Sequence, residues 1–250
     1  MKPIKIFSIF FSLILILGCE SSDIGTTTDD SSDTGTAGSL ARFTIAGNYL
    51  YTVELQQLKI FNISDEKQPA FIKQIYPGFD IETIFSKDDY LFLGSRWGVY
   101  IFDISNPESP EEISIYSHIY SCDPVVVSGN YAYSTLNSSG SCGRGLNQLD
   151  VIDISDIENP TQVAEIEMES PKGLGVSGNL LFVCDNGIKV YNISNPESPQ
   201  YIKKEAVDAY DVIPVGNLLL VAAESGLYEY EFDANGNLTF VSTLYTITKK

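Results

Sequence analysis

A repeat of about 40 residues runs through the chain from residue 40 onward, and it restricts the possible folds more than any other feature. In four copies an apolar segment is followed by the pattern [DN]-I-S-[DN]-x-x-x-P. The four complete patterns occupy residues 62–69, 103–110, 153–160 and 192–199. A fifth apolar segment begins at Gly226, lacks the proline and turns instead through residues 233–237. The five segments begin at residues 57, 98, 148, 187 and 226, which gives intervals of 41, 50, 39 and 39 residues.

Each copy also contains a hairpin signal upstream of the apolar segment. Gly-Asn pairs mark four of these turns, at residues 47–48, 129–130, 178–179 and 216–217, and an Asp-Asp pair at residues 88–89 marks the remaining one. Gly and Asn tolerate the positive φ that two-residue hairpin turns require. In the third copy the pattern therefore predicts strands over residues 124–128, 131–135, 149–154 and 161–166.

Four antiparallel strands in a repeat of this length are typical of one blade of a β-propeller. We therefore predict an all-β fold over residues 40–250, namely a five-bladed β-propeller with four-stranded antiparallel blades. A six-bladed or incompletely closed propeller is the alternative. No segment after residue 18 shows a useful stretch of the 3.6-residue period of an amphipathic helix.

The third copy carries a resemblance to a known repeat. Its Leu-Asp-Val-Ile-Asp sequence at residues 149–153, followed by Ile-Ser and by Pro160, resembles the LVIVD repeat, and the resemblance extends over about residues 40–233. Asn stands in place of the last Asp at positions 62 and 192, and Glu231 replaces it in the fifth copy. The resemblance implies a β-propeller of a bacterial surface or secreted protein, and it supplies no catalytic residues.

Residues 1–18 have the features of a lipoprotein signal peptide. Lys2 and Lys5 precede an apolar run over residues 6–17, which is too short to span a bilayer as a helix. The run leads into Ile-Leu-Gly-Cys at residues 16–19, which resembles the lipobox of bacterial lipoproteins. In that family the chain is cut before the cysteine, so that Cys19 becomes the lipidated first residue. An ordinary signal peptide cut elsewhere is the alternative.

Residues 19–39 are expected to form a disordered tether between this lipid and the propeller. Residues 20–38 contain nine Ser or Thr and five acidic residues, but Ile24 is their single bulky apolar side chain, so the segment cannot bury enough apolar surface to fold. By resemblance we expect a location at the bacterial outer membrane or cell surface. An acidic signal for surface export is another interpretation of the same segment.

The order of the strands separates two faces of the predicted propeller. If strands alternate in direction, the hairpin turns and the repeated Ile-Ser loops lie on one face, which we expect to be structural. The second-to-third-strand connections and the crossings between blades lie on the other face. Irregular loops on a rigid scaffold are where binding tends to occur, so we predict the ligand surface there. The candidate binding residues are Arg96, Trp97, Tyr120, Asp123, Tyr210 and Asp211.

The cysteines fit an exported protein. Cys122 precedes the third blade and Cys142 lies in the long connection of that blade, so a disulfide between them is possible; two free thiols are the alternative. Cys184 lies in an apolar strand and is expected to be buried. No C-x-x-C spacing occurs, and we expect no metal and no cofactor.

The formal charge of −18 argues against a nucleic-acid partner. We predict a lipid-anchored, cell-envelope binding module that is not an enzyme, whose ligand is an unidentified protein or glycan and which contacts the membrane through its lipid alone. The alternatives are a carbohydrate-active enzyme resembling glycosidases and a scaffold for outer-membrane assembly. The predicted innermost strands are apolar and offer no paired acids, which argues against the enzyme.

Overall fold

A computed structural model describes residues 38–118, 124–138 and 146–245. They belong to the second of two compact units, Ser32–Lys250, and the first unit, Met1–Ser31, lies outside the described residues. The described residues form twenty strands in five four-stranded antiparallel sheets. No helix occurs among them. The fold is therefore an all-β, five-bladed propeller, as the sequence predicted.

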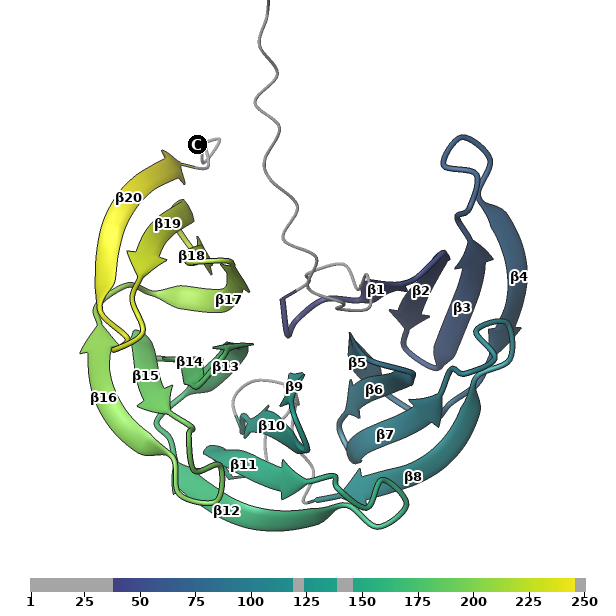
Figure 1. Cartoon of the computed structure of the whole chain (residues 1–250), viewed down its shortest axis with the longest axis horizontal. Coiled ribbons are helices and arrows are strands. Elements are labelled where there is room, and N and C mark those ends of the chain that lie inside the picture. The colour runs from purple at the N-terminus through teal and green to yellow at the C-terminus, as the bar shows by residue number, and fades with distance from the viewer. Residues whose placement is uncertain (1–37, 119–123, 139–145, 246–250) are drawn as a thin grey trace, which may run out of the picture. The chain divides into compact units, whose positions relative to one another are not determined.

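The strands of each blade follow chain order, with the first strand innermost and the fourth outermost (Figure 1). Blade 1 contains β1 (Phe43–Ala46), β2 (Tyr49–Glu54), β3 (Gln57–Asn62) and β4 (Ala70–Ile75). Blade 2 contains β5 (Ile81–Lys87), β6 (Tyr90–Ser95), β7 (Gly98–Asp103) and β8 (Glu111–Ser117). Blade 3 contains β9 (Val125–Ser128), β10 (Tyr131–Leu136), β11 (Gln148–Asp153) and β12 (Thr161–Glu167). Blade 4 contains β13 (Pro171–Ser177), β14 (Leu180–Asp185), β15 (Ile188–Asn192) and β16 (Gln200–Glu205). Blade 5 contains β17 (Ala209–Val215), β18 (Leu218–Ala223), β19 (Gly226–Phe232) and β20 (Leu238–Tyr245).

The hairpin turns between the first and second strands are the ones that the Gly-Asn pairs predicted. Gly47, Gly129, Gly178 and Gly216 have φ between 53° and 60°, and Asp88 takes the same conformation in blade 2 with φ 52°. Only the first of the two turn residues has positive φ, as in a type II′ turn.

The repeated Asp or Asn has one structural role in four blades. Its side-chain oxygen accepts a hydrogen bond from the backbone N–H two residues later, which closes an Asx turn. The distances are 2.9 Å for Asn62 to Ser64, 2.6 Å for Asp103 to Ser105, 2.8 Å for Asp153 to Ser155 and 2.8 Å for Asn192 to Ser194. Because Asn and Asp both offer this oxygen, the replacements at positions 62 and 192 leave the loop intact.

The hydrophobic core is divided into four clusters, and each joins two consecutive blades. Tyr51 and Leu91 belong to the cluster between blades 1 and 2, and Phe92 and Ala132 to the cluster between blades 2 and 3. The other two join blades 3 and 4 and blades 4 and 5. None of the described residues forms a helix long and apolar enough to cross a membrane.

Candidate functional site

The propeller has two faces that differ in regularity. The hairpin turns and the loops between third and fourth strands form the face that we call the turn face. The connections between second and third strands and the crossings from one blade to the next form the opposite face, the crossing face. Four of the five connections on the crossing face have two residues, whereas that of blade 3 spans residues 137–147. The crossing face is therefore the irregular one.

Arg96 and Trp97 form the two-residue connection of blade 2. The Arg96 Nε donates to the Glu82 Oε1 at 3.0 Å, so the pair links the connection to β5. The backbone N–H of Trp97 donates to the Ser95 Oγ at 3.0 Å, and Trp97 is 51% exposed. The tight turn thus presents an indole to solvent beside an ion pair. Both residues were predicted candidates.

Tyr210 lies at the start of β17, in a second group on the same face. The Lys172 Nζ lies 4.6 Å from the centre of the Tyr210 ring and 3.3 Å from the Asp208 Oδ1. Blade 5 carries Tyr210 and blade 2 carries Trp97, so the structure places these two aromatic candidates in separate groups, on blades that are not neighbours. No sequence signal points to Lys172, because its role depends on the strand register.

Asp211, another predicted candidate, is 9% exposed and bonded to its own chain. Its Oδ1 accepts from the Ser39 Oγ at 3.0 Å and its Oδ2 from the Leu40 N–H at 3.2 Å. Ser39 in turn accepts from the Leu174 N–H at 2.7 Å. Burial raises the pKa of Asp211 to about 6, although these hydrogen bonds act in the opposite direction. We call this group the axial clasp, because it ties the segment before β1 to the innermost strands of blades 4 and 5.

A second buried acid, Asp185, organises the crossing into blade 4. Its Oδ1 accepts from the N–H of Ser170 at 2.6 Å and from the N–H of Glu169 at 3.1 Å, and the Lys189 Nζ lies 2.6 Å from its Oδ2. Burial acts to raise the pKa of Asp185, but the lysine and the backbone donors outweigh it and the pKa is lowered. These contacts make Asp185 a structural residue.

The long connection of blade 3 borders a hollow of about 720 Å³. Asn147 fixes its base, because its Oδ1 accepts from both the N–H and the Oγ of Ser138, at 2.8 and 2.9 Å. Two exposed carboxylates, two amides and two apolar side chains share the hollow with this serine. The lining residues are Ser138, Leu146, Asn147, Gln148, Glu165, Glu167 and Met168. Sequence reasoning located the enlarged connection but missed Glu165 and Glu167, because they come from a regular outer strand.

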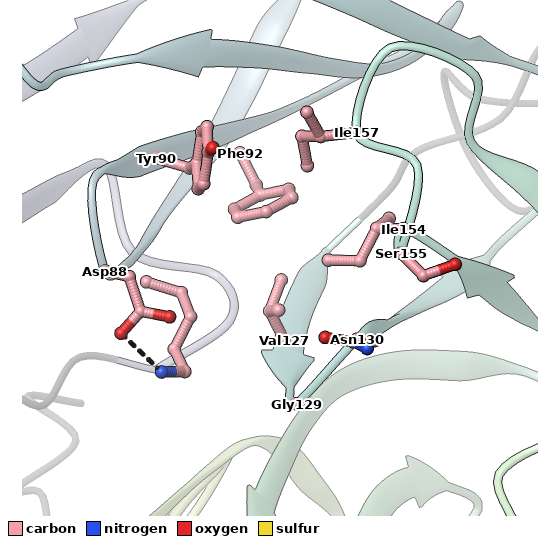
Figure 2. A pocket seen from close by; sticks show the side chains of 10 residues that line it. Asp88, Tyr90, Phe92, Val127, Gly129, Asn130, Ile154, Ser155 and Ile157 are labelled. Carbon is pink, nitrogen blue, oxygen red and sulfur yellow. Dashed lines mark hydrogen bonds and ion pairs between the residues drawn. The ribbon is translucent and has the colours of Figure 1, made fainter.

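A smaller pocket of about 220 Å³ lies on the turn face between blades 2 and 3 (Figure 2). Phe92, Val127 and Ile154 line its inner part, and Lys87 and Asp88 form an ion pair of 2.7 Å at its edge. Its volume is below the usual range for small-molecule sites, and its apolar residues belong to the core between the two blades. We therefore assign it to blade packing.

Several predicted residues lie outside the described residues. They are Cys19, Tyr120, Cys122, Asp123 and Cys142, so the lipidation, the disulfide and these two binding candidates stay predictions. Cys184 is buried, as expected, and burial raises the pKa of its thiol. Within the described residues, no three His, Cys, Asp or Glu side chains are grouped so that they could hold a metal ion.

Comparison with known proteins supports the repeat assignment. The LVIVD repeat matches residues 82–118, 121–140, 142–167 and 171–204. The chain therefore carries LVIVD repeats, and the matched residues fall in blades 2 to 4. Blades 1 and 5 were recognised from the spacing of the repeat and are present in the structure. None of the curated protein sequences matches the chain significantly.

Solved structures with the same fold include proteins of different kinds. The periplasmic gluconolactonase PpgL from Pseudomonas aeruginosa has 16% identity and a TM-score of 0.62, and the match covers 80% of this chain and 68% of that one. A protein from Lactobacillus plantarum has 15% identity and a TM-score of 0.63, over 80% and 69% of the two chains. BamB from Moraxella catarrhalis has 14% identity and a TM-score of 0.51, over 81% and 59%. At these identities the likeness shows the fold alone.

The similarity to the gluconolactonase overturns our prediction that the protein is not an enzyme. That prediction rests on the apolar innermost strands of the propeller. A solved enzyme has the same fold, so the fold does not support that exclusion. The comparison assigns no reaction to this chain, because fold and function are separable.

Proposed function

We propose that the protein is a lipid-anchored β-propeller of the cell envelope that binds a protein or glycan on its crossing face. The hollow lined by Ser138, Leu146 and Asn147 carries this proposal. It lies at the one connection that departs from the repeat, and a rigid propeller supports it. On the turn face, by contrast, the repeated Asp and Asn side chains are used in turns within the loops.

The chemistry of the hollow favours a ligand rich in hydroxyl or amino groups. The Glu165 and Glu167 carboxylates offer acceptors and Leu146 supplies an apolar contact. The Asn147 amide is used within the chain and shapes the hollow instead. Carboxylates and amides hydrogen-bond sugar hydroxyls or peptide N–H groups, while apolar side chains pack against their carbon skeletons. The exposed Trp97 ring adds a flat surface elsewhere on the same face.

The proposed anchor keeps this activity at a membrane. Lipidation of Cys19 with more than one acyl chain would hold the protein there stably. If the 19 residues from 19 to 37 form the proposed unfolded tether, its end-to-end distance would be about 25 Å. A tether of that length would favour envelope ligands close to the membrane.

Glycan-array screening and pull-down from an envelope fraction test the proposal, with the mature chain from residue 19 carrying Cys19→Ser. A Glu165→Gln/Glu167→Gln variant should weaken binding of the recovered ligand at least about tenfold, since two charge-assisted acceptors are lost. Glu158→Gln, in a turn-face loop of the same blade, is the matched control and should bind normally. Equal binding by all three proteins would contradict the proposal.

Catalysis is a second candidate, and Asp211 is the observation that favours it. A buried carboxyl with a pKa near 6 is typical of a general acid or base. Ser39 and Leu40 occupy both of its oxygens, which is why binding ranks first. Hydrolysis of gluconolactone and of aryl glycosides by the mature chain, abolished in Asp211→Asn, would establish this candidate. Rates equal to those in buffer would dismiss it for these substrates.

A further inference from the structure

One face of the two outer strands of blade 3 lines part of the hollow. In β11 and β12, Gln148 lies directly opposite Glu167, and Asp150 lies directly opposite Glu165. Residues two positions apart on a strand point to the same side, so these four side chains share one face of the blade. Gln148, Glu165 and Glu167 line the hollow, and Asp150 in the same row is 1% exposed. This face therefore presents carboxylates to the hollow.

The opposed acids Asp150 and Glu165 set blade 3 apart from the other blades. Like charges directly opposite each other destabilise a sheet, and burial of a carboxylate adds a cost of desolvation. The corresponding cross-strand pairs of the other blades contain no acid; they are Lys59 with Gln74, Tyr100 with Ile115, Lys189 with Lys204 and Tyr228 with Thr243.

The charges of this face have no lysine or arginine partner in the part of the chain that the structure describes. The like-charged pair of blade 4 does have one of opposite sign, since the Lys189 Nζ lies 2.6 Å from the Asp185 Oδ2. In contrast, no Lys or Arg among the described residues forms an ion pair with Asp150, Glu165 or Glu167. A ligand with positive charge would supply what the blade lacks.

The uncharged polar side chains around the hollow direct donors toward the chain itself. The Gln148 Nε2 donates to the Asp150 Oδ1 at 2.5 Å, so the amide oxygen is the end of Gln148 that points away from this carboxylate. The Asn147 Nδ2 donates to the Glu169 carbonyl oxygen at 2.8 Å, and the Ser138 Oγ donates to the Asn147 Oδ1 at 2.9 Å. The groups left to a ligand are therefore chiefly acceptors.

A hollow of acceptors favours a ligand that carries donors and positive charge. Lys and Arg side chains have N–H donors and no acceptor, whereas a sugar hydroxyl both donates and accepts and would use only part of its capacity here. Leu146 and Met168 also line the hollow, and such side chains pack against the methylene stem of a Lys or Arg. The formal charge of −18 attracts a cationic partner over a longer range.

We propose that the hollow binds a basic segment of a protein partner, with a Lys or Arg side chain paired to the carboxylates of Glu165 and Glu167. This ligand class rests on the proposed function and narrows it, from a protein or glycan to a protein with a cationic contact. Hydrogen bonds between an ammonium or guanidinium group and a carboxylate are stronger than those between neutral groups. The bound cation also offsets the repulsion between Glu165 and Asp150.

Isothermal titration calorimetry of the mature chain with Cys19→Ser tests this ligand class. The probes are tetralysine with blocked ends and the same peptide with every Lys side chain acetylated, which removes the charge and keeps the stem. Tetralysine should bind, and its acetylated form should bind at least about tenfold more weakly. Glu165→Gln/Glu167→Gln should weaken the binding of tetralysine by a similar factor, because both carboxylates are lost.

The matched control is Glu66→Gln/Glu158→Gln, which removes the same charge from two loops between third and fourth strands on the turn face. Because the total charge of the two double variants is equal, long-range attraction is weakened equally in both. The control should therefore bind tetralysine within about twofold of the wild type, whereas the variant of the hollow should not.

Equal binding of the two peptides, including no binding of either, would overturn the cationic ligand, and so would equal weakening by the two double variants. A neutral envelope glycan whose binding is lost in Glu165→Gln/Glu167→Gln would also overturn it but would leave the proposed function in place. If neither tetralysine nor any recovered envelope ligand depends on Glu165 and Glu167, the proposed function fails as well.

Discussion

At the scale of single residues, the polar side chains of this propeller include those that close loops and those that join distant parts of the chain. The Asp and Asn of the repeat belong to the first kind, since each accepts a backbone N–H within its own loop. Their spacing identified them in the sequence, and their role follows from local geometry. The structural role of Asp211 could not be predicted from the sequence, because its partner Ser39 is 172 positions away along the chain.

The loop-closing role predicts unequal effects of two substitutions at Asp103. Asp103→Ala removes the acceptor for the Ser105 N–H and should lower the free energy of unfolding by about 0.5–1 kcal/mol, because the site is half-exposed. Asp103→Asn keeps the accepting oxygen and should lower the free energy of unfolding much less. Urea unfolding of both variants measures the difference, and an equal loss in each would mean that charge matters instead.

Asp211 predicts a pH dependence of stability. Its pKa is raised from 3.8 to about 6 in the folded protein, so folding is most favourable while the carboxyl is protonated. Its contribution is complete below pH 4 and is lost as the pH rises to 6, by up to about 3 kcal/mol. The free energy of unfolding of the wild type relative to Asp211→Asn should fall over this window. A difference that does not vary between pH 4 and pH 7 would contradict the buried ionisable clasp.

At the scale of strands and turns, the repeat predicted most of the structure. In blade 3 the predicted bounds differ from the observed ones by one residue at most. The third and fourth strands of every blade are paired with a shift in register that was not predicted. All five blades have this shift at the same place, as between Ile101 and Phe102. It has no sequence signature, because a register shift changes which residues pair and leaves the apolar alternation recognisable.

Two glycines at turns of blades 2 and 3 should differ in their tolerance of a side chain. Gly98 has φ 148°, and an added Cβ would lie 2.1 Å from the carbonyl oxygen of Tyr116. Gly129 has φ 56° and open space around the Cβ position. Gly129→Ala should therefore cost about 1–2 kcal/mol from backbone conformation alone, and Gly98→Ala distinctly more. Thermal unfolding of both variants compares their losses of stability. A smaller loss for Gly98→Ala than for Gly129→Ala would contradict the described turn.

At the scale of the whole molecule, the fold could be predicted because each repeat is one blade, whereas the candidate site could be predicted only in part. The choice of the crossing face follows from the strand order, and the enlarged connection of blade 3 follows from the length of its repeat. The contribution of Glu165 and Glu167 depends on how β12 lies beside Ser138, Leu146 and Asn147, and no local sequence pattern predicts that arrangement.

The packing of the blades predicts position-dependent costs for equivalent leucines. Leu181 is fully buried between blades 3 and 4, so Leu181→Ala should cost about 2–5 kcal/mol. Leu50 occupies the same strand position in blade 1 but is only partly buried, and Leu50→Ala should cost about 1 kcal/mol or less. Chemical denaturation compares them, and equal losses would show that Leu50 is covered within the chain.

Site-specific photo-cross-linking tests most directly whether the crossing face binds the ligand. Benzoylphenylalanine would replace Trp97 or Leu146 on the crossing face, or Lys87 or Glu158 on the turn face, and the mature chain would be irradiated with an envelope fraction. Binding on the crossing face predicts a defined adduct from positions 97 and 146 and none from positions 87 and 158. Adducts from the turn-face positions alone, or equally from all four, would contradict it.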